Sequence, residues 1–204
     1  AKVLGNNKYG IDFSLEDDYY GDTRFHIPFI AWYQVMNASL ALTTMEVLKD
    51  RIPVTMEQLQ AGIANTRWQG RMETILPGVI VDGAHNEDGV RRFVETAERF
   101  QKEYPLTLLF SAVNDKDYQD MIHTICSRIK FRKVVTTEVG GYREVPSAEL
   151  AEIFCKEGCK DIGNSDNIEE AFHMAHEAKG EDGMLFCVGS LYLVGEIKTL
   201  LLKK

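Results

Sequence analysis

The segment after the apolar run at 79–81 combines a carboxylate, an imidazole and an amide that can cap a helix. Asp82 and Gly83 come first, followed by His85 and Asn86. The pattern predicts Asp82 at a strand end, a tight turn at Gly83 and a helix capped by Asn86. This arrangement directs a carboxylate and an imidazole into a crevice. Asx turns and solvated loop histidines are common, so the spacing alone also allows a structural role for both side chains.

A hydroxyl stands at the end of a second apolar run. Ser190 follows residues 184–188 and precedes the last amphipathic segment, where it is predicted to cap a helix. The hydroxyl and the free N–H groups behind it can hold a carboxylate or a phosphate, although a helix cap needs no ligand. Two further strand exits, 111–117 and 140–143, contain Asx or glycine residues and are either crevice loops or plain turns. Arg71 adds a cation shortly before the first segment.

Regular alternation of strands and helices is predicted to position these residues. Apolar, β-rich runs alternate with stretches whose apolar residues recur at i, i+3, i+4 and i+7. The expected strands are 72–76, 79–82, 106–110, 133–137 and 184–188, with a weak sixth near 161–162. Near-continuous apolar strands indicate a sheet covered on both faces. Residues 67–204 are therefore predicted to form an α/β domain, a Rossmann-like, mostly parallel sheet with helices on both faces.

Residues 1–66 show a different, less regular pattern. Short strands are expected at 9–14 and 24–29, then a long helix at 32–49, and a second helix after Pro53 that Thr55 caps. These helices have few predicted neighbours within the segment. We expect residues 1–66 to be the tail of a domain whose beginning is absent.

Composition excludes several classes of protein. The 204 residues carry a net charge of −8 and no basic cluster, so nucleic acid is not an expected partner. No apolar run approaches the roughly 20 residues of a membrane span, and the N-terminal residues Ala1 to Gly5 lack the apolar region of a signal peptide, so the chain is expected to be cytoplasmic. Cys155 with Cys159, and His173 with His176, lack further ligands in a suitable pattern, so no metal site is expected.

Known phosphate-binding and nucleophile motifs are absent from the sequence. It has no G-x-x-x-x-G-K-[ST], no G-x-G-x-x-G after a strand and no G-x-S-x-G. The residues alone therefore predict a Rossmann-like domain with a polar crevice and without a phosphate cradle of its own.

Several motifs in order carry a resemblance to a known family. Trp68, Gly70, Arg71 and Glu73 match the pattern W-P-G-R-x-E, and residues 82–86 match D-G-A-H-N. Further matches are Asn114 to Tyr118, Arg143 before Pro146, Gly189 to Leu193, and Tyr33, Gln34, Asn37 and Ala38 upstream. The sequence thus resembles the folylpolyglutamate synthases of the Mur-ligase superfamily. It departs from the pattern at Gln69 and Glu87, where the family has proline.

The resemblance implies an ATP-dependent acid–amino acid ligase. Such an enzyme uses ATP and Mg²⁺ to convert the terminal carboxylate of a folate into an acyl phosphate, which the amine of L-glutamate attacks. Residues 1–66 would be the remnant of the central ATPase domain and 67–204 the glutamate-binding C-terminal domain. The P-loop and the magnesium ligands would lie in an N-terminal part outside this chain, so the chain alone is expected to be inactive. The parent enzyme is expected to be a monomer.

The resemblance also implies roles for five residues. Asn37 would hydrogen-bond the adenine of ATP, Asp82 would accept from the ribose hydroxyls, and Arg71 would reach the phosphates as a catalytic cation. His85 and Ser190 would place the glutamate, with His85 also catalytic. An Arg guanidinium suits phosphate because its fork pairs with two oxygens at once.

Three other functions stay open. A Mur-type ligase would act on a UDP-muramyl peptide precursor, although the D-G-A-H-N form favours the folate branch. A non-catalytic module that binds a small molecule would keep the fold without the reaction. A hydrolase that uses Asp82 and His85 has no accompanying nucleophile or metal-ligand set.

Overall fold

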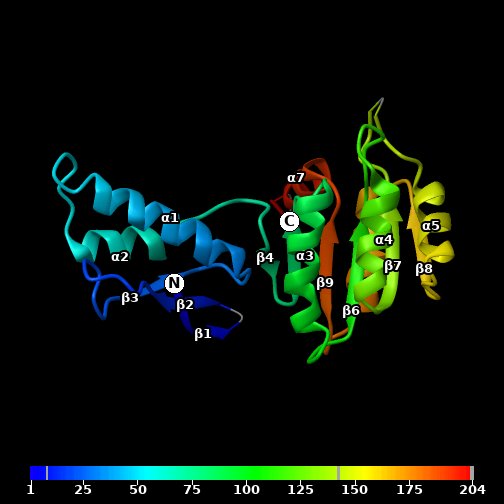
Figure 1. Ribbon diagram of the computed structural model, residues 1–204. Coiled ribbons are helices and arrows are strands. Elements are labelled where there is room, and N and C mark those ends of the chain that lie inside the picture. Colours follow the sequence, from blue (N-terminus) through cyan, green and yellow to red (C-terminus); the bar gives the residue numbers. More distant parts are fainter. Residues whose placement is uncertain (8, 142, 203–204) are drawn as a thin grey trace. The chain divides into compact units, whose positions relative to one another are not determined.

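The computed structural model describes residues 1–7, 9–141 and 143–202, and the chain forms two compact units (Figure 1). One unit comprises Ala1–Trp68 and the other Gln69–Lys204. The division falls within the segment 65–71, where the sequence pattern changes. Tyr142, part of one predicted crevice loop, lies outside the described residues.

The first unit packs two helices on a small antiparallel sheet. Its strands, in the order β1-β2-β3, are β1 (Lys2–Asn7), β2 (Gly10–Ser14) and β3 (Arg24–Ile27), and its helices are α1 (Tyr33–Val47) and α2 (Met56–Ala64). The strands predicted at 9–14 and 24–29 correspond to β2 and β3, whereas β1 was not predicted. Thr55 caps α2 as predicted, because its hydroxyl accepts from the Gln58 N–H while the Gln58 side chain accepts from the Thr55 N–H.

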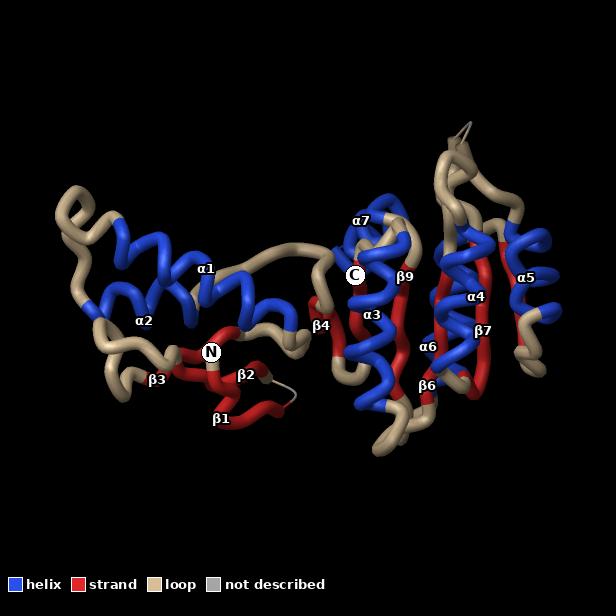
Figure 2. The backbone as a smooth tube through the Cα atoms, viewed as in Figure 1, coloured by secondary structure: helices blue, strands red, loops and turns tan. Residues whose placement is uncertain are grey.

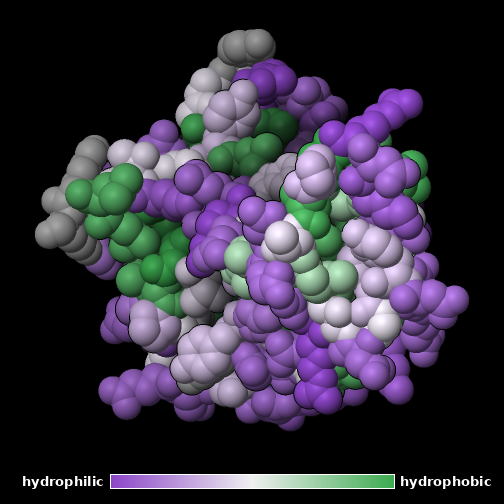
Figure 3. Space-filling view, turned by 90° about the vertical axis from the view of Figure 1, so that its left-hand side faces the viewer, coloured by the Kyte–Doolittle hydropathy of each residue, from purple (hydrophilic) through white to green (hydrophobic). Residues whose placement is uncertain are grey.

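Helix α1 carries apolar residues on two sides. Val35 and Leu42 are buried against the sheet, and the hydroxyl of Tyr20 donates to the carbonyl of Leu42 at 2.7 Å. On another side of α1, large apolar residues at mostly four-residue spacing are exposed: Trp32, Met36, Leu40 and Val47. On the face drawn in Figure 3, apolar side chains reach the surface in small groups between polar ones. A helix that is apolar on two sides is typical of one covered on both.

The second unit confirms the predicted fold class. Its six strands have the order β4-β5-β9-β6-β7-β8, in which β4 is antiparallel to β5 and every other neighbouring pair is parallel. The strands are β4 (Glu73–Leu76), β5 (Val79–Asp82), β6 (Leu106–Phe110), β7 (Phe131–Thr137), β8 (Ile162–Ser165) and β9 (Met184–Val188). The helices are α3 (Glu87–Phe100), α4 (Tyr118–Arg128), α5 (Ser147–Lys156), α6 (Ile168–Lys179) and α7 (Leu191–Leu202).

Helices cover both faces of this sheet, which explains the continuous apolar strands (Figure 2). On one face, residues of α6 and α7 such as Ala171 and Leu193 pack on Leu185 and Cys187. On the other face, the ring of Phe93 in α3 meets Phe186 of β9 at 5.5 Å between centroids. Helix α7, which follows β9, lies on one face of the sheet, whereas α3, which follows the neighbouring β5, lies on the other face. The connections that leave these two adjacent strands therefore run to opposite faces. Crevices for ligands form at such switch points, beyond the carboxyl ends of the strands.

Candidate functional site

Three strands bring the predicted site residues of this unit together. In the register of the sheet, Asp82 of β5 pairs with Val188 of β9, which in turn pairs with Phe110 of β6. The residues that follow these positions therefore lie at one edge of the sheet, His85 after β5 and Ser190 after β9. The central part of the site has the arrangement that the spacing predicted.

Two glycines make this edge compact. A Cβ atom on Gly83 would lie 2.1 Å from the Leu191 side chain, so only glycine lets the first turn of α7 approach the β5 exit. Gly189 has φ +109°, and its Cβ atom would lie 2.0 Å from the Ser111 carbonyl oxygen. The close approach of β9, β6 and α7 thus depends on the absence of two side chains.

The Asp82 carboxylate is buried, and backbone amides hold both of its oxygens. Oδ2 accepts from the Met72 N–H at 2.9 Å and Oδ1 from the Ala84 N–H at 2.8 Å. Burial raises the pKa of Asp82 to about 6, although these two N–H donors and the nearby Arg71 charge lower it. Asp82 therefore fastens the turn that carries Arg71. The contact of Asp82 with ribose hydroxyls remains a prediction. The carboxylate lone pairs that the two amides do not use would accept these hydrogen bonds.

Arg71 stands on a tightly held turn. Its neighbour Met72 has φ +46°, an unusual backbone conformation for a non-glycine residue. The carbonyl of Gly70 accepts from the Gly83 N–H at 2.8 Å, and the N–H of Gly70 donates to Glu73 at 2.7 Å. The guanidinium of Arg71 is half-buried and, within the described part of the chain, has no hydrogen-bond or ion-pair partner. A cation on a fixed backbone whose guanidinium makes no hydrogen bond or ion pair within the described residues is suited to an anionic ligand.

Glu73 links this turn to the last helix. The ammonium of Lys198 donates to the two carboxylate oxygens of Glu73 at 2.8 and 3.0 Å, and both side chains are partly buried. The Glu73 carboxylate therefore holds the Gly70 amide and α7 at once. Sequence reasoning noted Glu73 only as part of a motif and missed Lys198, because no local signal joins residues 125 positions apart.

The half-buried His85 has a defined tautomer. Nδ1 lies 2.7 Å from the Gly83 carbonyl oxygen, and since a carbonyl only accepts, Nδ1 carries the proton. In the neutral ring, Nε2 then has a free lone pair. Asn86 caps α3 as predicted, accepting from the Gly89 N–H at 2.8 Å, with Glu87 and Asp88 in the first turn. His85 is thus held between a strand end and a capped helix.

Ser190 occupies the start of α7. Its hydroxyl oxygen accepts from the Tyr192 N–H at 3.1 Å, and the side chain is buried. The capping role predicted for Ser190 is confirmed. The other N–H groups of this first helical turn give the crevice a partly positive end.

A second cation lies next to α7. Arg143 donates to the Asp115 carboxylate at 3.0 Å and to the hydroxyl of Tyr192 at 3.1 Å. The N–H of Asn114 also donates to the Arg143 carbonyl at 2.8 Å, so the loops after β6 and β7 are joined. The sequence analysis placed Arg143 in a strand exit and in a family motif, but its contact with Tyr192 depends on the strand order and was not predicted.

Asn37, the fifth predicted site residue, lies in the other unit. It is exposed on α1, and its amide donates to the Gln34 side chain at 2.9 Å. The four residues of the crevice and Asn37 are therefore positioned by separate compact units.

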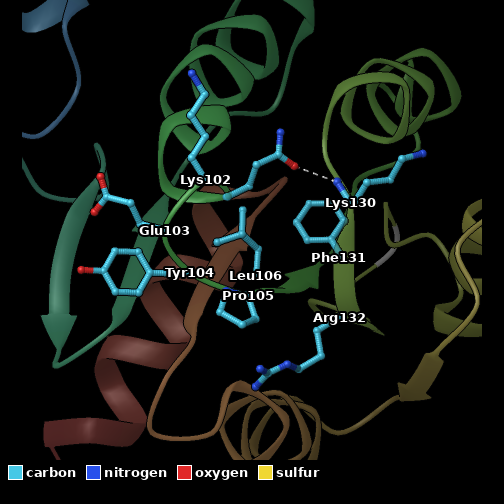
Figure 4. Close-up of a pocket in the computed structure, with 9 residues that line it drawn as sticks. Lys102, Glu103, Tyr104, Pro105, Leu106, Lys130, Phe131 and Arg132 are labelled. Carbon is cyan, nitrogen blue, oxygen red and sulfur yellow. Dashed lines mark hydrogen bonds between the residues drawn. The ribbon is translucent and has the colours of Figure 1, made fainter.

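The opposite edge of the sheet carries an open hollow of about 440 Å³. Figure 4 shows Glu103 and Tyr104 on one side of it and Phe131 and Arg132 on the other. It lies at the amino ends of β6 and β7, where parallel sheets do not usually bind ligands. We assign the functional site to the carboxyl edge.

The crevice combines groups suited to anions and to proton transfer. Arg71 and the N-terminus of α7 favour phosphate or carboxylate oxygens, and the Nε2 lone pair of His85 can accept a proton. Among the residues that the structure describes, no group of three or more His, Cys, Asp or Glu side chains could hold a metal ion. The geometry thus makes this edge of the α/β domain suited to binding an anion.

Comparison with known proteins identifies this class of domain. Residues 70–191 match the family model described as "Mur ligase, glutamate ligase domain". The chain therefore belongs to the Mur ligase family, on the branch of the folylpolyglutamate and dihydrofolate synthases.

Individual relatives place the chain in that branch. It is 30% identical over 194 residues to the dihydrofolate synthase/folylpolyglutamate synthase of Bacillus subtilis. This match covers 91% of this chain and 43% of the relative. The folylpolyglutamate synthase of Mycobacterium tuberculosis, solved with ADP and AMPPCP, matches with a TM-score of 0.72 and 25% identity over 87% of this chain and 42% of the other. Escherichia coli FolC, solved with DHPP and ADP, shares the fold with a TM-score of 0.77 and 18% identity over 98% of this chain and 45% of the other.

The chain spans less than half the length of these relatives. Within its described part, no helix is both long and apolar enough to cross a membrane.

Proposed function

We propose that this chain is the C-terminal part of an ATP-dependent ligase that adds L-glutamate to the terminal carboxylate of a folate. The observation that carries the proposal is the clamped turn at Arg71, which the hydrogen bonds of Gly70 and Met72 hold in place. Its guanidinium lies at the same sheet edge as His85 and Ser190 and makes no hydrogen bond or ion pair within the described residues. Family membership supports the reaction class, and the relatives with ADP support a nucleotide as one substrate.

Each crevice residue has a role in this reaction. Arg71 neutralises phosphate oxygens, first of ATP and then of the acyl phosphate, and its fixed backbone reduces the cost of orienting the charge. The first turn of α7 behind Ser190 holds the carboxylate of the incoming glutamate. These two contacts would set the distance between the amine and the activated carbon.

His85 supplies the proton acceptor. The ammonium of glutamate must lose a proton before its nitrogen attacks, and Nε2 of His85 can take that proton because Nδ1 is already committed to Gly83. The nitrogen then forms a bond to the acyl carbon, the carbon–oxygen bond to phosphate breaks, and phosphate leaves with the second proton of the nitrogen. Asp82 supports these reaction steps by holding the turn that carries Arg71. We include its contact with the ribose hydroxyls in the proposal.

Mg²⁺ has no suitable cluster of ligands among the described residues of this chain. Because the described residues contain no cluster of three or more possible ligands, we derive no step through a metal here. Asn37, on α1, would contact the adenine of ATP. The exposed apolar side of α1 supports the proposal that this helix belongs to a larger ATPase domain.

Substrate choice by the whole enzyme tests this proposal. Incubation with ATP, L-glutamate and tetrahydrofolate is expected to release ADP and to yield a product heavier by one glutamyl residue, detected by mass spectrometry. The purified 204-residue chain should give neither product, since it has no P-loop sequence. Glutamylation by the chain alone would refute the fragment hypothesis. Activity on a UDP-muramyl precursor with none on folates would favour the Mur-type alternative instead.

A further inference from the structure

Two cysteines outside the crevice lie close together. The Sγ atoms of Cys126 on α4 and Cys159 between α5 and β8 are 3.7 Å apart, and both thiols are free. Cys126 is buried, whereas Cys159 is partly exposed. Since 33 positions separate them, the fold alone creates this contact.

The surrounding contacts hold both thiols in place. One turn before Cys126, Nδ1 of His123 lies 3.0 Å from the Glu157 carboxylate, which joins the same two segments. The N–H of Cys159 donates to the Phe154 carbonyl at 3.1 Å, so the end of α5 fixes its backbone. A disulfide requires a sulfur–sulfur distance near 2 Å. The remaining gap of less than about 2 Å is within the reach of side-chain rotation.

The two thiols differ in reactivity. The hydrogen bond from Cys126 and the charge of Lys130 lower the pKa of Cys159, against the effects of burial and of Glu157. The same contact, together with burial, raises the pKa of Cys126. Because the thiolate is the nucleophile, Cys159 is the thiol that an oxidant should meet first.

We propose that Cys126 and Cys159 are a modification site that forms a reversible disulfide with a peroxide as the oxidant. The Cys159 thiolate attacks one oxygen of hydrogen peroxide, which gives a sulfenic acid and, after protonation, water. The Cys126 thiol then attacks the Cys159 sulfur, and the sulfenic oxygen leaves as a second water. Overall, two thiols are oxidised by two electrons and one peroxide is reduced to two waters.

The disulfide would fasten the outer part of the sheet. It joins α4 to the segment that leads into β8, the edge strand, which pairs only with β7. Closing a loop of this length restricts the unfolded chain more than the folded one. We expect the oxidised chain to melt roughly 5–10 °C higher than the reduced chain.

The two other cysteines provide internal controls. Cys155 is exposed on α5, four positions before Cys159, and Cys187 is buried in β9. Cys155 is the more accessible thiol, but among the described residues it is the sulfur of Cys159, not that of Cys155, that contacts Cys126. A Cys155→Ser variant should therefore form the same disulfide, whereas Cys126→Ser should not.

Oxidation of the purified chain tests the proposal. The chain is treated with one equivalent of hydrogen peroxide, alkylated and digested, and the peptides are identified by mass spectrometry. We expect a peptide pair that links Cys126 to Cys159, its loss on reduction with dithiothreitol, and the rise in melting temperature. In Cys126→Ser, the Cys159 sulfenic acid should persist and react with dimedone, and Cys126→Ala serves if the serine variant does not fold.

Three results would overturn the proposal. One is a linked pair that contains Cys155 in place of Cys126. Another is oxidation of each thiol to the sulfinic or sulfonic acid without a link. The third is a link that forms only after the chain is unfolded in urea. None of these outcomes depends on ligase activity, so they test the thiol pair separately from the proposed function.

Discussion

Asp82 illustrates how one side chain can serve a site without facing solvent. Its carboxylate is buried at the end of β5 and accepts from two backbone amides, one before β4 and one after β5. The amides favour the ionised form, but the loss of hydration outweighs them and raises the pKa to about 6. The charge next to Arg71 thus changes near neutral pH.

The ionisation of Asp82 should make the stability of the folded chain depend on pH. A raised pKa in the folded state means that, between about pH 4 and 6, the folded chain binds more protons at this site than the unfolded chain. The contribution of Asp82 to stability should therefore fall by roughly 3 kcal/mol as pH rises through this range and stay constant above it.

The free energy of unfolding of the wild-type chain and of Asp82→Asn is measured at several pH values. The difference between the two at each pH reports the contribution of the Asp82 carboxylate. The stability of the wild type relative to the variant should decrease from pH 4 to 6. The ¹³C resonance of the carboxyl carbon should titrate with a midpoint near 6. A midpoint below 4 would show that the two amides, not burial, dominate.

Residue types were easier to predict than their partners. Asp82, His85 and Ser190 follow apolar runs, and turn and capping preferences predicted their places at a strand end or helix start. That Asp82 accepts from Met72 could not be predicted, because this bond depends on the positive φ of Met72 and on the packing of β4 beside β5.

At the scale of elements, the close approach of the β9 exit to the end of β6, and of α7 to the end of β5, shapes the sheet edge that carries the candidate site. Gly189 sits where the backbone of β9 turns into α7, and it combines a positive φ with direct contact to the Ser111 carbonyl. Both conditions exclude a side chain, since a Cβ atom would strain the backbone and collide with an atom that cannot move alone.

Gly189→Ala should therefore destabilise the chain by roughly 2–4 kcal/mol and displace Ser190. Gly195→Ala, within α7, is the matched control, since a Cβ atom there meets nothing within 4 Å. That variant should be stabilised by roughly 0.5–1 kcal/mol because alanine favours a helix more than glycine does. Urea denaturation of both variants measures their free energies of unfolding. Equal free energies for Gly189→Ala and Gly195→Ala would contradict close packing at Gly189.

The elements themselves followed from the sequence where hydrophobic periodicity was strong. Strands β5, β6 and β9 are buried throughout and coincide with the predicted runs. Strand β1 escaped prediction because Gly5, Asn6 and Asn7 weaken its pattern and most of its residues are exposed. The strand order could not be derived, since nothing local indicates that β9, the last strand, inserts between β5 and β6.

At the scale of the whole molecule, the net charge and the length of the chain both bear on the proposed function. A net charge of −8 does not favour phosphates and folates, so the few cations in the crevice must act locally. Arg143 is already paired with Asp115, which leaves Arg71 as the stronger candidate for an incoming anion. The chain also spans less than half of its relatives, which agrees with the proposal that it acts within a larger ligase.

The central claim is that Arg71, held by its clamped turn, stabilises the phosphates during ligation. The most direct measurement is kcat/KM for ATP-dependent glutamate addition by the whole enzyme with Arg71→Ala, beside Arg132→Ala at the opposite edge of the sheet as control. We predict at least a roughly hundredfold loss for Arg71→Ala, partial recovery in Arg71→Lys, which keeps the charge without the fork, and little change for Arg132→Ala. Equal kcat/KM values for the wild type and Arg71→Ala would contradict the account.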